Sequence, residues 1–283
     1  MKNIEIQAYG KVNLALDVLY KREDGYHEID TVMQQISLRD TLIIENTDKK
    51  NIEIHSNKRE LPLDSSNLVY KAWDSIVKKT GVRRGVSVDI KKNIPIAAGL
   101  AGGSSNAAAT LRALNTLWDL KLSEDELYLL ARDIGADVPY CLMGGTAHAQ
   151  GIGEKLRRLK PFREKHMLLF NPGIEVSTAQ VYKNLKLDGP SGVDIEKLIS
   201  YIERDDLLNV AKNMKNIMEK TVIAEYPIIG KVKEDMNELG ALGSLMSGSG
   251  ATVFGLFEDP EKLDDCKKKL EKIKGLAIKC KTL

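Results

Sequence analysis

The feature that most constrains this chain is a glycine-rich stretch, residues 95–106, which runs directly into a helix-forming segment rich in alanine and leucine. The stretch reads Pro-Ile-Ala-Ala-Gly-Leu-Ala-Gly-Gly-Ser-Ser-Asn, so three glycines fall within five residues and two hydroxyls follow. The alternating residues 86–91 before it predict a strand, which gives the order strand, loop, helix. Free N–H groups and the macrodipole favour an anion at such a helix start, and glycine lets the backbone approach it closely. The stretch predicts a polyphosphate loop; a plain turn capped by Ser105 or Asn106 is the alternative.

The common phosphate-binding patterns do not fit this loop. A Walker A loop ends in Gly-Lys-Ser/Thr, whereas here Gly103 is followed by two serines and Asn106. A second glycine-serine loop, residues 247–250, lacks the third glycine of the dinucleotide fingerprint and leads into a predicted strand instead of a helix. The sequence also contains no protein-kinase catalytic loop and no metal-binding triplet. A less common type of phosphate loop is therefore needed.

Two pairs of side chains near the N-terminus are candidates for ligand contacts. Lys11 and Asn13 have the same parity in a predicted strand, so they project from one face and could meet an anionic ligand. Tyr26 and His27 directly follow an Asp-Gly turn, and they could stack on a flat ring and hydrogen-bond to it. The alternatives are a solvated strand face for the first pair and a hairpin connection with a half-buried tyrosine for the second.

Asp137 is a candidate catalytic carboxylate. It lies just beyond a predicted helix over residues 127–134, and it precedes Val138, which the following proline is expected to hold extended. An aspartate in such a place is also commonly a turn former or an N-cap. The residues alone leave both interpretations open.

The helical segments suggest how the chain is organised. Asn67 is the expected N-cap of a helix over residues 68–79. Two further helical stretches, at about 194–203 and 206–224, show no strand signal between or within them. The pattern restarts near residue 160, where we place a domain boundary.

Composition excludes several classes of protein. The net charge is +2 with interspersed signs, apolar residues make up 43% and charged residues 29%, which is an ordinary soluble balance without a nucleic-acid or membrane surface. No apolar run approaches the ~18 residues that a membrane span needs, and the N-terminus lacks a signal-peptide core. The three cysteines have no metal-like spacing, so we expect a reduced, cytoplasmic location without disulfides or zinc.

Seven motifs in this chain resemble those of the GHMP small-molecule kinases, which include galactokinase, homoserine kinase, mevalonate kinase and phosphomevalonate kinase. Within that superfamily their order is most similar to the kinases of 4-diphosphocytidyl-2-C-methyl-D-erythritol, which act in the non-mevalonate isoprenoid pathway. The glycine-rich loop carries the likeness to the superfamily, and the Gly-Tyr-His and Gly-Ala-Asp-Val-Pro motifs carry the likeness to the family. The motifs cover residues 11–16, 24–27, 99–105, 135–140, 151–154, 176–179 and 247–250.

The resemblance implies an α+β fold of two domains. Residues 1–160 would form an N-terminal GHMP kinase domain like domain 2 of ribosomal protein S5, and residues 161–283 a ferredoxin-like C-terminal GHMP kinase domain. The active site would lie in the cleft between them, with backbone from both glycine loops.

The resemblance also implies a reaction, the ATP-dependent phosphorylation of the substrate's 2-hydroxyl, with Mg²⁺ bridging phosphate oxygens. Asp137 would accept the hydroxyl proton, while Lys11 would keep that carboxylate ionised and offset developing negative charge. The ATP-binding residues implied are Pro95, Ile96, Ala97, Ala98, Gly99, Leu100, Ala101, Gly102, Gly103, Ser104, Ser105, Asn67 and Lys71. The substrate-binding residues implied are Asn13, Tyr26, His27, Thr178, Tyr182 and Gly248, with the three rings holding the cytosine.

The chain departs from the family pattern in two places. Asn106 stands where the family often has aspartate, and we assign it no catalytic role. The segment 216–219 lacks the acid that the family carries at its second position. The implied partner is a cytidine diphosphate-linked small molecule, with no nucleic acid or membrane, and the protein would be a monomer or weak homodimer.

Three other functions compete with this interpretation. The first is a kinase of a smaller alcohol, such as homoserine or mevalonate. Neither of these substrates has a flat base for Tyr26 and His27 to hold. An RNA-binding protein, suggested by the S5-like half, would need a basic stripe that the chain lacks. A catalytically inactive binding module would not need both Lys11 and Asp137.

Overall fold

The computed structural model describes residues 3–187, 189 and 191–283, and the chain divides into two compact units. Strands β1 (Asn3–Lys21) and β2 (His27–Thr47) each contribute to both units, and so does the glycine-rich stretch. The expected boundary near residue 160 falls within unit 2 and stays a prediction about the sequence domains. Unit 1 comprises Met1–Gly10, Leu38–Ile96 and Ala101–Met143, and unit 2 comprises Lys11–Ser37, Ala97–Leu100 and Gly144–Leu283.

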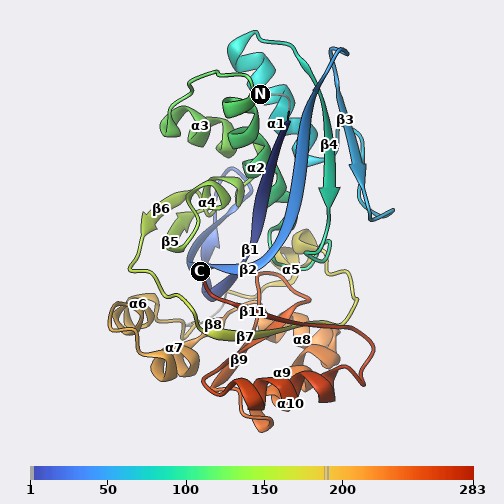
Figure 1. The fold of residues 1–283 in the computed structure, drawn as a ribbon. Coiled ribbons are helices and arrows are strands. Elements are labelled where there is room, and N and C mark those ends of the chain that lie inside the picture. The colour runs from blue at the N-terminus through green and yellow to red at the C-terminus, as the bar shows by residue number, and fades with distance from the viewer. Residues whose placement is uncertain (1–2, 188, 190) are drawn as a thin grey trace. The chain divides into compact units, whose positions relative to one another are not determined.

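Unit 1 is a sheet covered by helices. The sheet joins the unit's parts of β1 and β2 to β4 (Gly85–Lys91), which pairs antiparallel with β2, and to β3 (Ile52–Ser56), which pairs parallel with β4. The helices α1, α2 and α3 lie against these strands (Figure 1). Alternate residues of β4 are fully buried beneath them, because successive side chains of a strand point to opposite faces. The helices of this unit are α1 (Leu68–Thr80), α2 (Gly102–Leu117), α3 (Glu124–Ile134) and α4 (Val138–Met143).

Local capping explains where the helices of unit 1 begin. The Asn67 side chain accepts a hydrogen bond from the Val69 amide at 2.9 Å, which confirms the expected start of α1. A capping box between Ser123 and Glu126 begins α3. The expectation of an extended Val138 was wrong, because this residue begins α4. Proline at the second helical position is tolerated, since an N–H there would have no acceptor within the helix.

Unit 2 contains a four-stranded antiparallel sheet in the order β11-β7-β10-β9. The helices α9 (Pro227–Glu238) and α10 (Pro260–Leu270) pack against it, with Phe170, Phe257 and Met236 in a shared apolar core. This arrangement confirms the ferredoxin-like character expected for the C-terminal part of the chain. The strands are β7 (His166–Asn171), β9 (Gly243–Met246), β10 (Val253–Phe257) and β11 (Leu276–Lys281).

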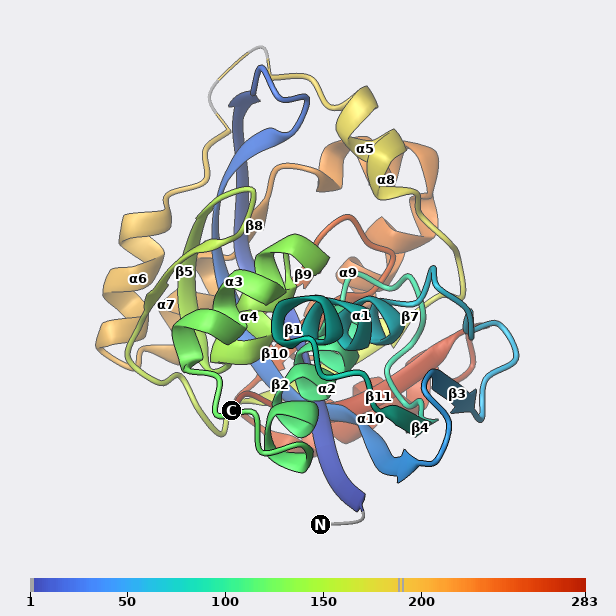
Figure 2. The same cartoon turned by 90° about the horizontal axis from the view of Figure 1, so that it is seen from above.

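The remaining elements of unit 2 include a strand pair beside β2 and three short helices. Strand β5 (Thr146–Gly151) pairs antiparallel with β2 and with β6 (Lys155–Arg158). The helix α5 (Thr178–Asn184) follows the hydroxyl cap Ser177. Figure 2, which looks from above, and Figure 1 both show α6 (Ile195–Glu203) beside α7 (Leu207–Asn213). No helix among the residues that the structure describes is long and apolar enough to cross a membrane.

The expected helix over 206–224 was wrong, because a short strand interrupts it. After α7 the chain forms β8 (Lys215–Asn216), which pairs parallel with β1, and only then α8 (Glu219–Glu225). The buried Asn216 amide donates to the carbonyls of Met246 and Gly248 at 2.9 and 2.8 Å, while its oxygen accepts from the Met218 amide. These distant hydrogen bonds override the helical preference of the local sequence.

Candidate active site

The helix α2 begins inside the glycine-rich stretch. Its N-cap is Ala101, in the left-handed region with φ 55°, and its first three residues are Gly102, Gly103 and Ser104. The N–H groups of a first helical turn have no acceptor within the helix, and no described side chain caps this end. The backbone here is therefore suited to hold an anion, as a polyphosphate loop requires.

The next two side chains turn into unit 1. Ser105 donates its hydroxyl hydrogen bond to the Tyr9 carbonyl and lies 3.2 Å from the sulfur of Cys141. Asn106 donates from its amide to Asp40 at 2.9 Å. Both side chains are buried and neither caps α2, so the alternative of a plain turn capped by one of them was wrong. The Ser105 hydroxyl is already engaged by these partners. Any contact of this hydroxyl with a phosphate stays a prediction.

The two glycine loops meet within unit 2. Gly99 has φ 75°, and a Cβ there would lie only 2.2 Å from the carbonyl oxygen of Ser247. The Ser247 hydroxyl donates to the Gly99 carbonyl at 2.9 Å, and the Lys11 amide donates to the Leu100 carbonyl at 3.1 Å. Glycine is required at position 99 both for its positive φ and for this close approach. Local patterns predicted the two loops separately, and only the resemblance implied that the backbone of both lies in one site.

Lys11 and Asn13 form a buried hydrogen-bonded chain beside the loops. The Lys11 ammonium donates to the Asn13 side-chain oxygen at 2.8 Å, and the Asn13 amide donates to the Thr31 hydroxyl at 2.8 Å. Thr31 in turn donates to the Ala15 carbonyl at 2.5 Å. All three side chains are buried, so the alternative of a solvated strand face was wrong. A Cβ at Gly248 would lie 3.6 Å from the Asn13 oxygen, which places this glycine next to them.

Thr31 is a member of this chain that the sequence did not reveal. It is fully buried in β2, and its partner Asn13 lies 18 residues earlier. A threonine within a strand carries no local mark of such a role, because β-branched residues are common there. Only the pairing of the strands could have indicated it.

The predicted base-binding residues of unit 2 also come together in part. The rings of His27 and Tyr182 stack, with centroids 4.7 Å apart and planes 22° from parallel. Burial, and then the charge of Lys21, lower the pKa of His27, so its ring is neutral near pH 7. The alternative of a hairpin connection is confirmed, since Tyr26 lies between the neighbouring strands β1 and β2, but its half-burial was wrong, because Tyr26 is 59% exposed. Thr178 shares a hydrogen bond of 2.7 Å with the Ser249 hydroxyl of the second glycine loop.

The remaining candidates lie in unit 1. Asp137 immediately precedes α4, and its carbonyl accepts from the Cys141 amide at 3.0 Å, so it occupies the N-cap position while its side chain is half-buried. The Asn67 side chain is used in capping α1 and in a hydrogen bond to the Pro62 carbonyl. Lys71 is exposed. The roles of these three residues remain predictions.

Family models match both parts of the chain. The model described as GHMP kinases N terminal domain matches residues 67–145, which include α2 and its first turn. The model described as GHMP kinases C terminal matches residues 198–275, which include the second glycine loop.

Similar proteins carry one name. The 4-diphosphocytidyl-2-C-methyl-D-erythritol kinase of Clostridium kluyveri is 47% identical over 94% of this chain and 95% of its own length. That of Caldicellulosiruptor bescii is 46% identical over 90% of this chain and 89% of its own. A crystal structure of 4-(cytidine 5'-diphospho)-2C-methyl-D-erythritol kinase matches with a TM-score of 0.83 and 34% identity, over 99% of both chains.

A second solved structure shares the fold alone. The homoserine kinase from Cytophaga hutchinsonii matches with a TM-score of 0.80 at 21% identity, over 100% of this chain and 95% of that one. The fold therefore extends across kinases of different alcohols, whereas the relatives at 46% and 47% identity share one name. The chain belongs to the 4-diphosphocytidyl-2-C-methyl-D-erythritol kinase family.

Proposed function

We propose that this protein transfers the γ-phosphoryl group of ATP to the 2-hydroxyl of 4-diphosphocytidyl-2-C-methyl-D-erythritol, giving the 2-phosphate and ADP in isoprenoid precursor synthesis. Family membership supports the choice of reaction. The observation that carries it at the site is the placement of Lys11 and Asn13 beside Gly99 and Gly248. A cation and an amide next to two glycine loops form a suitable setting for a phosphoryl group in transfer.

The residues divide the chemistry among them. The substrate oxygen attacks the γ-phosphorus, the bond to the β–γ bridging oxygen breaks, and the hydroxyl proton passes to Asp137. This requires the Lys11 ammonium and the Asp137 carboxylate to face the same hydroxyl. Phosphoryl transfer depends mainly on positioning and charge stabilisation, so few groups suffice. The first-turn amides of α2 would hold the β- and γ-phosphates, and residues 95–100 would shape the loop.

Mg²⁺ would assist by offsetting the negative charge of the phosphates during the transfer. Within the described residues, no group of three or more His, Cys, Asp or Glu side chains could hold a metal. Mg²⁺ commonly keeps several waters and binds largely through substrate phosphates, so it requires few protein ligands. Ser104 would be its protein contact, since it lies in the first turn of α2 and is only half-buried.

The substrate's base would lie against Tyr26, His27 and Tyr182. A neutral imidazole stacked on a tyrosine supports this, because it can stack on a base and also hydrogen-bond to its edge. Thr178 would contact the diphosphate side of the same ligand, and Asn67 with Lys71 would line the adenine pocket. We place the enzyme in the cytoplasm, as a monomer or weak homodimer.

A parallel assay of ATP consumption tests the substrate. The purified protein is given ATP, Mg²⁺ and either the cytidyl compound, homoserine or mevalonate at equal concentration. We expect turnover with the cytidyl compound at least about a hundredfold above the other two, because a missing base leaves the stacking and edge contacts unmade. Turnover with homoserine alone would contradict the proposal. Homoserine is an informative comparison because a homoserine kinase shares this fold.

A further inference from the structure

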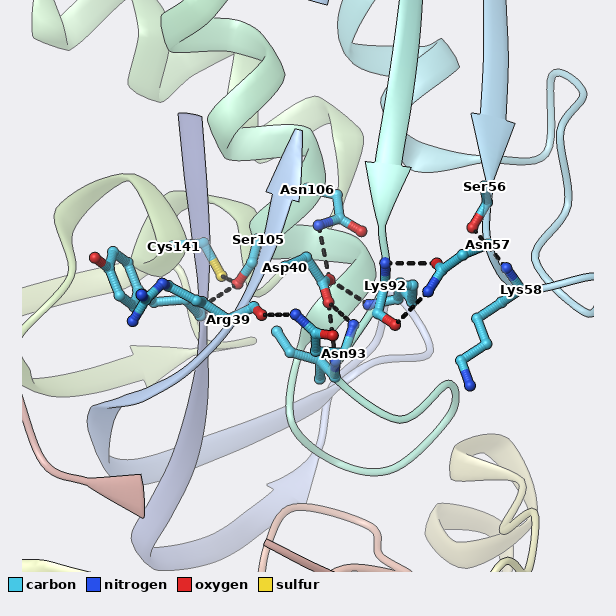
Figure 3. Close-up of polar contacts among 12 residues, drawn as sticks. Arg39, Asp40, Ser56, Asn57, Lys58, Lys92, Asn93, Ser105, Asn106 and Cys141 are labelled. Atoms are coloured by element: carbon cyan, nitrogen blue, oxygen red, sulfur yellow. Dashed lines mark hydrogen bonds and ion pairs between the residues drawn. The ribbon is translucent and has the colours of Figure 1, made fainter. Parts of the chain in front are cut away.

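Asp40 is a buried carboxylate that accepts four hydrogen bonds within unit 1. Three come from residues 92–94 and one comes from Asn106. One oxygen accepts from the backbone amides of Asn93 and Ile94 at 2.7 and 2.8 Å. The other accepts from the Asn106 side-chain amide at 2.9 Å and from the Lys92 ammonium. Figure 3 shows Asp40 between the end of β4 and the first turns of α2. A carboxylate has about four acceptor sites, so this one is fully used by the protein.

These donors lie at both ends of the glycine-rich stretch. Asn93 and Ile94 come directly before its first residue, Pro95, and Asn106 is its last residue. A single side chain therefore ties the entry of the loop to its exit. The intervening residues include the first-turn amides of α2, whose direction depends on how this helix start is held.

Lys92 packs directly under the start of α2. A Cβ at Gly102 would lie 2.6 Å from the Lys92 ammonium nitrogen and 3.0 Å from Cγ2 of Ile94. The side chains of Lys92 and Asp40 are 2% and 0% exposed. Burial lowers the pKa of Lys92, and the charge of Asp40 opposes that change. Without a counter-charge, the Asp40 carboxylate would compete with a phosphate for the positive N-terminal end of the α2 dipole. The Lys92 ammonium offsets the negative charge of Asp40.

We propose that Asp40, Lys92 and Asn106 form a positioning cluster that fixes the phosphate loop and thereby sets the affinity for ATP. The cluster acts through the backbone that it holds and does not itself bind the nucleotide. This inference rests on the proposed function in one respect, that ATP is the anion at the loop. It gives Asn106, which has no catalytic role in our scheme, a reason to be an amide, because aspartate there would face the carboxylate of Asp40.

The test is Asn106→Leu, which removes one donor from Asp40 and leaves the ion pair with Lys92 in place. We expect the Kd of a fluorescent ATP analogue and the KM for ATP to rise about tenfold, the usual effect of losing a hydrogen bond to a charged group. The KM for the cytidyl substrate should stay within about twofold, because its proposed residues lie in unit 2. The matched control is Asp74→Asn, which alters an exposed ion pair on α1 and should change neither constant.

A second variant guards against a failure of folding. The double change Asp40→Asn/Lys92→Met removes the buried charges together, a replacement that proteins often tolerate, and the new amide oxygen can still accept from Asn93 and Ile94. We expect it to stay folded, with an ATP affinity between that of Asn106→Leu and the parent.

The outcomes separate the two proposals. The inference is overturned if a folded Asn106→Leu, or the folded double variant where the single one fails, binds ATP like the parent. It is also overturned if both KM values rise equally, because that pattern indicates general loosening. A parent protein that binds ATP but does not phosphorylate the cytidyl compound contradicts the proposed function, while a specific loss of ATP affinity in the variants would still support the cluster.

Discussion

The two regions proposed to bind ligand are built in opposite ways. Around the start of α2, Asp40, Ser105 and Asn106 are buried, at 0%, 3% and 1% exposure, and each is hydrogen-bonded within unit 1. The groups left to meet a phosphate would be mainly the first-turn backbone amides of α2, with the half-buried Ser104 beside them. In the base-binding region the side chains themselves would meet the ligand, and Tyr26 is 59% exposed. The first region would be a backbone site held by the core, and the second a side-chain site on the surface.

This difference indicates how such a fold serves several substrates. A triphosphate is the same in every kinase of the superfamily, so a rigid site tied into the core can be kept. Exposed residues can change with little effect on the free energy of unfolding, whereas buried polar networks cannot. We therefore expect changes near α2 to alter stability and ATP affinity together, and changes at the base-binding residues to alter substrate affinity alone.

The largest effect should come from a residue outside both regions. Asp137→Asn removes the proposed general base while keeping the size and polarity of the side chain. We expect kcat to fall by about 10²–10⁴, the usual contribution of a general base, with the Kd for ATP unchanged. Steady-state kinetics and equilibrium binding measure the two quantities. Near-normal turnover would remove Asp137 from this role, and a lost affinity for ATP would mean that it belongs with the phosphate site.

Next in size are the changes at the stacked rings. His27→Ala and Tyr182→Ala should each raise the KM for the cytidyl substrate about 5- to 150-fold, since stacking on a base is worth about 1–3 kcal/mol. The KM for ATP should not change. Tyr20→Ala is the control, because Tyr20 is 56% exposed in the same unit and has no proposed role. If the two ring variants also lost ATP affinity, the two regions could not be as separate as we describe.

The same contrast explains what the sequence could predict. The strand, the glycine-rich loop and the following helix are local signals, as is the Asn67 cap of α1, and these were predicted. Asp40 and Thr31 were not, because their partners are remote: Asn93 and Asn106 lie 53 and 66 residues from Asp40. Local periodicity contains no information about such contacts. The strand β8 was missed for the same reason, since Asn216 is fixed by distant carbonyls.

The functional residues were predicted mainly by resemblance. Local patterns did not decide whether the strand face carrying Lys11 and Asn13 is a ligand site or is solvated. In the structure both side chains are buried. A lysine is rarely buried unless it is paired. The equal parity of Lys11 and Asn13 placed their side chains on one strand face but did not indicate that this face is buried. The start of α2 at Gly102 was also unexpected, because glycine disfavours helix interiors and its composition suggests a loop.

A smaller effect is expected where a buried hydrogen-bond network reaches Lys11, the proposed catalytic lysine. Thr31→Val removes the hydroxyl that accepts from Asn13 and donates to the Ala15 carbonyl. The loss of these buried bonds should lower the free energy of unfolding by about 1–3 kcal/mol. We also expect kcat to fall by up to about tenfold, because Asn13 would no longer be held beside Lys11. Thr31→Ser should restore both values. A loss of stability with unchanged kcat would show that Thr31 supports only the fold.

The smallest effect concerns the charge of His27. Burial lowers its pKa below the ordinary 6.5, so the unfolded chain takes up the proton at a higher pH than the folded one. Its contribution to stability is therefore complete above pH 6.5 and is lost as the pH falls through the lower, folded value. The KM for the cytidyl substrate should rise a few-fold over the same interval, because a charged ring has no acceptor nitrogen for the base edge. A pH profile of both KM values measures this, with His27→Gln as the control that should remove the dependence. If the KM for ATP rose in parallel, the effect would belong to the whole site and not to the base-binding rings.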